Sequence, residues 1–127
     1  MQRYGMPIHK FINKYERPQP APVRWIPHEN LAHPAAPLEG KWEIFAQESM
    51  TINPRDIKTI RLAIGLQLIR GVCSVALRQS LKIKRCSLQD GFVAESVDDM
   101  IITIQNNSDV PVNIVAGESL CFVSHQV

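Results

Sequence analysis

The sequence has few of the residue patterns on which common metal and catalytic sites depend. Its three cysteines form no C-x-x-C pair, and none of its four histidines stands at ligand spacing to them, so a zinc site is not expected. Six glycines form neither a G-x-x-x-x-G-K-[ST] nor a G-x-G-x-x-G phosphate loop. No nucleophile elbow or Cys–His pair stands out. These absences leave no catalytic residue, no metal and no cofactor to expect.

Long apolar runs are also missing. No run approaches the roughly 20 residues that a membrane-spanning helix needs, so a membrane partner is not expected. Residues 1–14 contain no uninterrupted apolar segment, which argues against a secretory signal. Free, buried cysteines then fit a reducing compartment, and we expect the protein inside the cell, in the cytoplasm or nucleus.

Positive charge is absent from the end of the chain. All fourteen Lys and Arg residues lie at or before Arg85, and twelve acids divide six and six around that point. Residues 1–85 therefore carry a net charge of +8 and residues 86–127 a net charge of −6. Such halves attract each other, either within one interleaved fold or between neighbouring subunits.

Proline is concentrated at the start of the chain, where it supplies seven of the first 37 residues. We expect residues 1–38 to form an extended arm without a core of its own, and residues 39–127 to form one domain. Large apolar side chains in the arm need another surface, which is either the same domain or a second subunit. The candidate oligomer contacts are Phe11, Tyr15, Trp25 and Ile26.

From Lys41 onward apolar residues recur at every second position, as in strands with one buried face. The clearest run is Ile60–Leu68, with apolar side chains at all five even positions. Short strands between turns predict an all-β jelly roll, β-sandwich or barrel, with no helix after Gly40. The other expected strands are Trp42–Phe45, Met50–Ile52, Val72–Leu77, Leu81–Arg85, Phe92–Ala94, Met100–Gln105, Val112–Val115 and Ser119–Val123.

One basic cluster is a candidate phosphate or anion patch: Arg78, Lys82, Lys84 and Arg85. On a strand, Lys82 and Lys84 would share one face and Arg85 would take the other. The cluster has no neighbouring aromatic residues for base stacking, so a solvated sheet face is the plainer interpretation and nucleic-acid binding is not favoured.

The later strands resemble the trimeric dUTPase family. Gly91-Phe92-Val93 matches the glycine and apolar pair that begin the family's hairpin, and the following strand ends at an asparagine, Asn106, as in the family. Gly117-Glu118 matches the start of a further motif, and Arg78 stands where the family has Pro-Arg-Ser-Gly-Leu. The similarity covers about residues 40–124 and implies a dUTPase-like distorted jelly roll that closes as a homotrimer.

The same resemblance implies that catalysis is lost. Ala94 occupies the position of the aspartate that orients the attacking water, and Val97 that of the aromatic residue that stacks on deoxyribose. Gln79 and Ser80 replace the phosphate-binding serine and glycine, and Ser119 replaces an arginine. The family's glycine-rich closing arm has no counterpart before Val127. An alanine cannot activate water, so no enzymatic activity is expected.

Two functions follow from this interpretation. The first is a non-enzymatic, homotrimeric interaction or structural module with an unidentified protein partner. Degenerate relatives of the family are mostly viral, so an accessory or virion-associated viral protein is one expectation. The alternative is a nucleotide or nucleic-acid phosphate binder without catalysis, built on Arg78, Lys82, Lys84 and Arg85.

Overall fold

A computed structural model describes residues 21–126, which are mostly short strands and the turns between them. One five-residue helix, α2 (Gln79–Ile83), lies between β7 and β8. No helix in the described range is long and apolar enough to span a bilayer. The strands are β1 (Val23–Pro27), β2 (Ala36–Leu38), β3 (Lys41–Phe45), β4 (Met50–Ile52), β5 (Ile57–Arg61), β6 (Ile64–Leu68), β7 (Val72–Leu77), β8 (Cys86–Leu88), β9 (Phe92–Val93), β10 (Ile101–Asn106), β11 (Val112–Ile114) and β12 (Ser119–Gln126).

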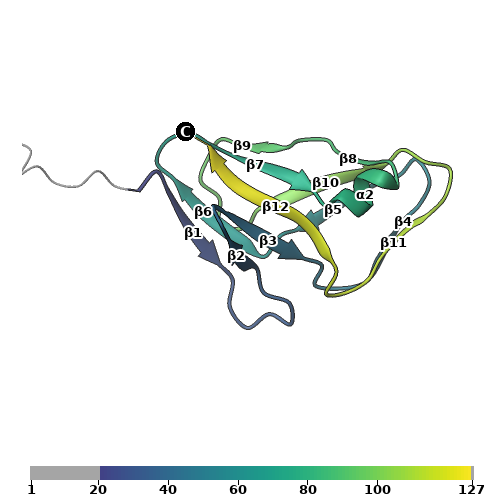
Figure 1. The fold of residues 1–127 in the computed structure, drawn as a ribbon, viewed down its shortest axis with the longest axis horizontal. Coiled ribbons are helices and arrows are strands. Elements are labelled where there is room, and N and C mark those ends of the chain that lie inside the picture. The colour runs from purple at the N-terminus through teal and green to yellow at the C-terminus, as the bar shows by residue number, and fades with distance from the viewer. Residues whose placement is uncertain (1–20, 127) are drawn as a thin grey trace, which may run out of the picture.

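Antiparallel sheets enclose the core. The largest has five strands in the order β2-β3-β12-β7-β9, and a second has the order β5-β10-β8. Two ribbons, β1-β6 and β4-β11, complete the described part of the fold. Figure 1 shows β12 crossing the molecule between β3 and β7. The inward-facing apolar residues of these sheets form one continuous core, so the predicted all-β sandwich is confirmed.

The run Ile60–Leu68 forms two strands instead of the single strand that its alternation predicts. β5 ends at Arg61, and β6 begins at Ile64. Between them Ala63 adopts a φ of 59°, which turns the chain from one sheet into the other. Leu62 and Ile64 both hydrogen-bond to Met100 across the corner, at 2.9 Å each. Residues 62–66 are all buried, so the apolar run continues through the corner without a break.

Gly65 lets the chain after β9 lie directly against β6. A Cβ atom at this position would stand 2.3 Å from the carbonyl oxygen of Asp98, which no side chain tolerates. Leu66 and Val97 form an antiparallel bridge there, with backbone hydrogen bonds of 2.8 and 3.0 Å. This close approach fixes the position of residues 97–99.

The described part of the proline-rich arm lies on the chain's own domain. β1 pairs with β6, and β2 pairs with β3. The half-buried Trp25 packs against the core, whereas Ile26 is 37% exposed. Phe11 and Tyr15 lie outside the described residues. Of the two surfaces that the sequence allowed, residues 23–38 use that of their own domain.

Candidate functional site

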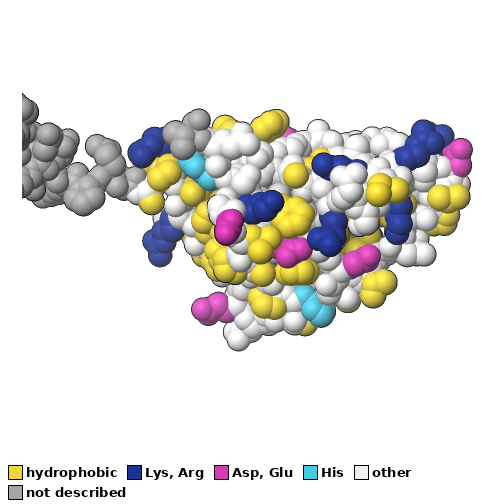
Figure 2. Space-filling model, viewed as in Figure 1, with side chains coloured by type: hydrophobic (Ala, Val, Ile, Leu, Met, Phe, Trp, Pro, Cys, Tyr) yellow, Lys and Arg dark blue, Asp and Glu magenta, His cyan; other side chains and the backbone are white. Residues whose placement is uncertain are grey.

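The predicted basic cluster lies at α2 and in the turn that follows it. Lys82 belongs to the helix, Lys84 caps its C-terminus and Arg85 comes next. All three are exposed, and none forms an ion pair with another residue of the range 21–126. Figure 2 shows Lys and Arg side chains around the part of the molecule where Figure 1 places α2. The structure therefore groups these three cations on one end of the molecule.

The predicted strand Leu81–Arg85 is wrong, as is the expectation of no helix after Gly40. Lys82 N–H donates to the Arg78 carbonyl at 3.2 Å, and Lys84 N–H donates to that of Ser80 at 3.3 Å. Leu81 is buried, while Ile83 is 72% exposed, so the alternation of the two apolar residues does not correspond to one buried face. A φ of 66° at Arg85 ends the helical turn. Lys82 and Lys84 consequently do not share a sheet face.

Arg78 differs from the other three cations of the cluster because it forms an ion pair with a carboxylate. Its Nη1 lies 3.2 Å from Oε2 of Glu43 on β3. Its backbone N–H donates to the Leu120 carbonyl on β12 at 2.9 Å. The nearby carboxylate lowers the local positive potential, so an arginine paired in this way attracts a phosphate less strongly than an unpaired one.

A groove of about 480 Å³ is lined by β9, β10 and the segment that joins them. We call it the hairpin groove. Its lining is largely apolar and includes Val75, Phe92, Val93, Val97, Met100 and Ile101. The charged residues of the lining are Asp90, Glu95 and Asp99, and no Lys, Arg or His of the described range belongs to it. This chemistry disfavours a nucleotide triphosphate, because its phosphates would meet carboxylates and no cation.

Two of the five residues expected to mark lost catalysis line the same groove, whereas Gln79 and Ser80 lie in α2 and Ser119 begins β12. Ala94 is exposed, and Val97 is half-buried against Leu66. The nearest carboxylate in sequence, Glu95, is also part of the lining. Neither Ala94 nor Val97 supplies a group that holds a water molecule or a sugar hydroxyl.

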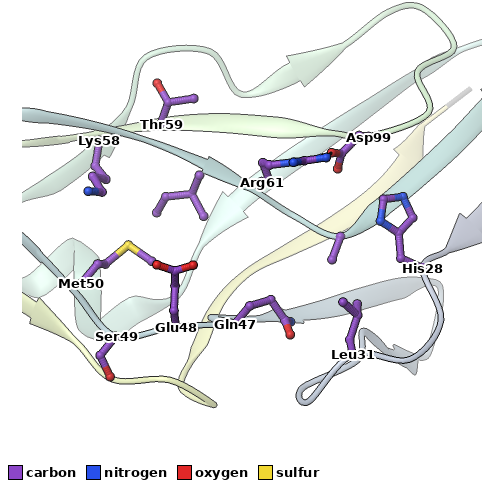
Figure 3. Close-up of a pocket in the computed structure, with 12 residues that line it drawn as sticks. His28, Leu31, Gln47, Glu48, Ser49, Met50, Lys58, Thr59, Arg61 and Asp99 are labelled. Atoms are coloured by element: carbon purple, nitrogen blue, oxygen red, sulfur yellow. Dashed lines mark hydrogen bonds and ion pairs between the residues drawn. The ribbon is translucent and has the colours of Figure 1, made fainter.

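A second cavity, of about 510 Å³, lies between β5 and residues 47–50 (Figure 3). We call it the edge cavity. Arg61 points across it to Asp99, with Nε donating to Oδ2 at 2.5 Å. Beside this pair His28 Nε2 lies 3.0 Å from the Asp98 carbonyl oxygen. Lys58 is the remaining Lys or Arg of the described lining, so the cavity gathers too little free positive charge for a polyphosphate.

Within residues 21–126, β5 has an open edge beside this cavity. It is the first strand of its sheet, with β10 as its neighbour. Leu62 N–H donates to Met100, and Ile60 stands opposite Ile102. In an antiparallel pair the hydrogen-bonding residues alternate, so Thr59 and Arg61 turn their backbone groups away from β10. The edge can accept an extended peptide as a further strand. Sequence reasoning missed this site because no residue pattern marks which strand becomes an edge.

Ion pairs join the basic and acidic parts of the sequence within one chain. Arg55 Nη2 lies 2.8 Å from Oδ1 of Asp109, and Arg61 pairs with Asp99. Both link an arginine before residue 85 to an aspartate after it. An interleaved fold therefore accounts for part of the charge division.

The cysteines do not form a reactive site. Cys73, Cys86 and Cys121 are free and buried, and burial raises the pKa of each thiol, that of Cys121 to about 12. The neutral thiol is a poor nucleophile and a poor metal ligand. The described residues also contain no group of three or more His, Cys, Asp or Glu side chains that could hold a metal ion.

The fold is similar to those of solved dUTPases, although no protein-family model and no curated protein matches the sequence. The native dUTPase of EIAV has a TM-score of 0.65 at 10% identity, over 82% of this chain and 88% of that chain. A variant dUTPase of Staphylococcus bacteriophage 80alpha has a TM-score of 0.66 at 13% identity, over 80% and 87%. A variant dUTPase from phage phi11 of S. aureus has a TM-score of 0.62 at 16% identity, over 80% and 88%. The chain therefore has the dUTPase-like fold that its sequence resemblance implies, in a strongly divergent form.

Proposed function

We propose that the protein is a non-enzymatic interaction or structural module that assembles as a homotrimer. The observation that carries this proposal is the lining of the hairpin groove, which has Ala94 at the position of the expected catalytic aspartate and no Lys, Arg or His from residues 21–126. An alanine at that position cannot orient a water molecule for attack on a phosphate. The groove's acids also repel a triphosphate. The ion pair of Arg78 with Glu43 further weakens its use as a phosphate ligand.

The homotrimer and a viral role rest on the fold. The resemblance implies assembly in threes, and the similar structures include dUTPases of EIAV and of staphylococcal phages. An accessory or structural protein of a virus is the role that fits these neighbours together with a site lacking the catalytic aspartate. The open edge of β5 gives such a module a place to bind an extended segment of a partner protein.

Incubation of the full chain with dUTP and Mg²⁺ tests the loss of catalysis. The proposal predicts no dUMP above the amount formed without protein. Formation of dUMP in proportion to protein concentration, abolished in an Arg78→Ala variant, would contradict the proposal. The variant distinguishes turnover at this site from a contaminating enzyme, which the substitution would leave unchanged.

A second function, phosphate binding without catalysis, is favoured by one observation. Lys82, Lys84 and Arg85 are exposed together at α2. Fluorescence anisotropy of a labelled single-stranded oligonucleotide, measured over a series of salt concentrations, tests it. Phosphate-driven binding weakens steeply as salt rises. Lys82→Glu combined with Lys84→Glu should abolish it, while two charge reversals away from α2, Arg24→Glu on β1 with Lys41→Glu on β3, should reduce it less. No binding at low salt would exclude this function.

A further inference from the structure

The hairpin groove presents unusually large apolar side chains to solvent. Phe92 is 62% exposed and Ile101 is 57% exposed, and they line the groove from β9 and β10. Large exposed apolar groups gathered in one depression are typical of a surface that binds another protein segment. The groove thus has the shape and apolar lining of a docking site.

The charged residues of the groove determine the sign of the net charge that a bound segment should carry. Asp90, Glu95 and Asp99 are the charged residues of the groove within the described range. Since Asp99 is paired with Arg61, Asp90 and Glu95 carry the negative charge that has no ion-pair partner among residues 21–126. Oδ1 of Asp99 is buried and has no hydrogen-bond partner among residues 21–126. A segment that combines apolar side chains with lysine or arginine would match both properties.

The beginning of the described chain lies close to this groove. Val23 on β1 stands opposite Leu68 on β6, and Leu68 N–H donates to Ser96 Oγ at 2.8 Å. Leu66 on the same strand bridges to Val97 in the groove wall. Neighbouring strands are about 4.8 Å apart, so Val23 lies on the order of 10 Å from residues 96 and 97.

The residues that precede Val23 in the sequence combine basic and apolar side chains, as the groove requires. Residues 1–20 contain four basic residues (Arg3, Lys10, Lys14 and Arg17) and a single acid, Glu16. The same stretch carries Phe11, Ile12 and Tyr15 among its basic residues. Prolines 18, 20 and 22 predict an extended spacer of about 3.1 Å per residue. From Arg17 to Pro22 such a spacer covers about 15 Å, which exceeds the separation estimated above.

We propose that residues 8–17 bind the hairpin groove of their own domain. Phe11, Ile12 and Tyr15 cover the exposed apolar surface around Phe92 and Ile101, and Lys10 and Lys14 approach Asp90 and Glu95. This arrangement places Phe11 and Tyr15 on their own domain and not on a second subunit. The inference goes beyond the proposed function and does not depend on it, because the contact is made within one chain.

Paramagnetic relaxation enhancement on the full chain tests the contact. Asn13→Cys introduces an accessible thiol between the docking residues, while the three native cysteines are buried and resist labelling. A nitroxide at position 13 should remove most of the amide signal of residues 92–97 and 100–102. Amides of the β2–β3 turn at residues 38–41 should keep their signal. Unchanged amides in the groove would overturn the proposal.

Charge-reversal variants distinguish binding in the groove from binding elsewhere on the surface. Asp90→Lys combined with Glu95→Lys should restore the lost signals, whereas Glu39→Lys, an exposed acid outside the groove, should not. Lys10→Glu with Lys14→Glu should also restore them. Combining both pairs of reversals should bring the broadening back, since the two charge patterns match again. Failure of this rescue would contradict the electrostatic part of the proposal.

A sample that mixes two differently labelled forms of the chain shows whether the groove is occupied by the same chain or by a second copy. Spin-labelled chain without ¹⁵N is mixed with ¹⁵N-labelled chain without a spin label, and no broadening is expected. Broadening in the mixture would show docking on a second copy and would overturn the proposal. If the groove is covered by α2 of a second copy, Lys82→Glu with Lys84→Glu would change the groove amides while Lys10→Glu with Lys14→Glu would not, and the proposal would again be wrong.

Discussion

The hairpin groove and the α2 end differ in how their charges are placed. In the groove, carboxylates surround an apolar floor between β9, at the edge of one sheet, and β10, the central strand of another. At α2, exposed cations surround a short helix whose one buried residue is Leu81. The chain thus combines a dUTPase-like fold with a hairpin groove whose lining is acidic and apolar. The difference indicates that the groove suits a basic, apolar chain segment better than a nucleotide.

β10 connects the two regions, since it begins at the groove and ends near the turn after α2. Its last residue, Asn106, is fully buried. The side-chain amide of Asn106 donates to the carbonyls of Ile52 and Val110 at 3.0 and 2.8 Å, and its Oδ1 accepts from Ser108. This network fixes the α2 end of the sandwich independently of the groove.

The largest expected effect comes from removing that network. Asn106→Ala leaves several buried backbone groups without partners, and we expect it to lower the free energy of unfolding by about 3–4 kcal/mol. Asn107→Ala, which removes one exposed hydrogen bond to Ser87, should cost less than about 1 kcal/mol. Urea denaturation measures both. Equal losses would show that the α2 end does not depend on Asn106.

A smaller effect tests the attachment of α2. Leu81→Ala should lower the free energy of unfolding by about 2–4 kcal/mol because it leaves a cavity in the core. Ile83→Ala, at a side chain that is 72% exposed, should change it by less than about 0.5 kcal/mol. Equal costs for the two substitutions would support the predicted strand over the observed helix.

The groove has a matching test at Gly65. A methyl group there meets the Asp98 carbonyl, so Gly65→Ala should cost about 1–3 kcal/mol and shift the amides of residues 97–99. At Gly91 a Cβ would lie 3.5 Å from the Val75 carbonyl oxygen, which is ordinary contact. Gly91→Ala should therefore cost less than about 1 kcal/mol. Thermal unfolding with amide spectra distinguishes them, and unchanged amides in Gly65→Ala would contradict the close approach.

At neutral pH the smallest effect comes from Cys121, next to the strand end that leads into α2, because its contribution appears only at alkaline pH. Burial raises its folded pKa from 9.0 to about 12, so the unfolded thiol ionises first as pH rises. Stability is then unaffected below pH 9 and falls by about 1.4 kcal/mol per pH unit between the two values. A Cys121→Ala variant should show a shallower loss at alkaline pH. Parallel profiles for the two proteins would contradict this assignment.

Sequence reasoning predicted the strands with clear alternation but not the corners between them. Val72–Leu77 is the strand expected, because one face of it is buried along its whole length. Ile60–Leu68 concealed a corner at Ala63, since buried side chains continue through the bend. Leu81 and Ile83 suggested a strand because two apolar residues cannot distinguish a period of two from one helical turn.

The candidate site was less predictable than the fold. Arg78, Lys82, Lys84 and Arg85 are neighbours in sequence and remain close together, but the Glu43 partner of Arg78 lies 35 residues earlier in the chain. Asp90, Glu95 and Asp99 line one groove because β9 pairs with β7 while β10 pairs with β5 and β8, which places the segment between β9 and β10 around it. Pairing between distant segments decides such clusters, and a single sequence does not reveal it.

Native mass spectrometry of the full chain with dUTP and Mg²⁺ present tests the proposed function most directly, because one spectrum reports both assembly and nucleotide binding. The account predicts a species with three times the 14.3 kDa mass of one chain and no bound nucleotide. A monomer, or a trimer that carries dUTP or dUMP, would contradict it.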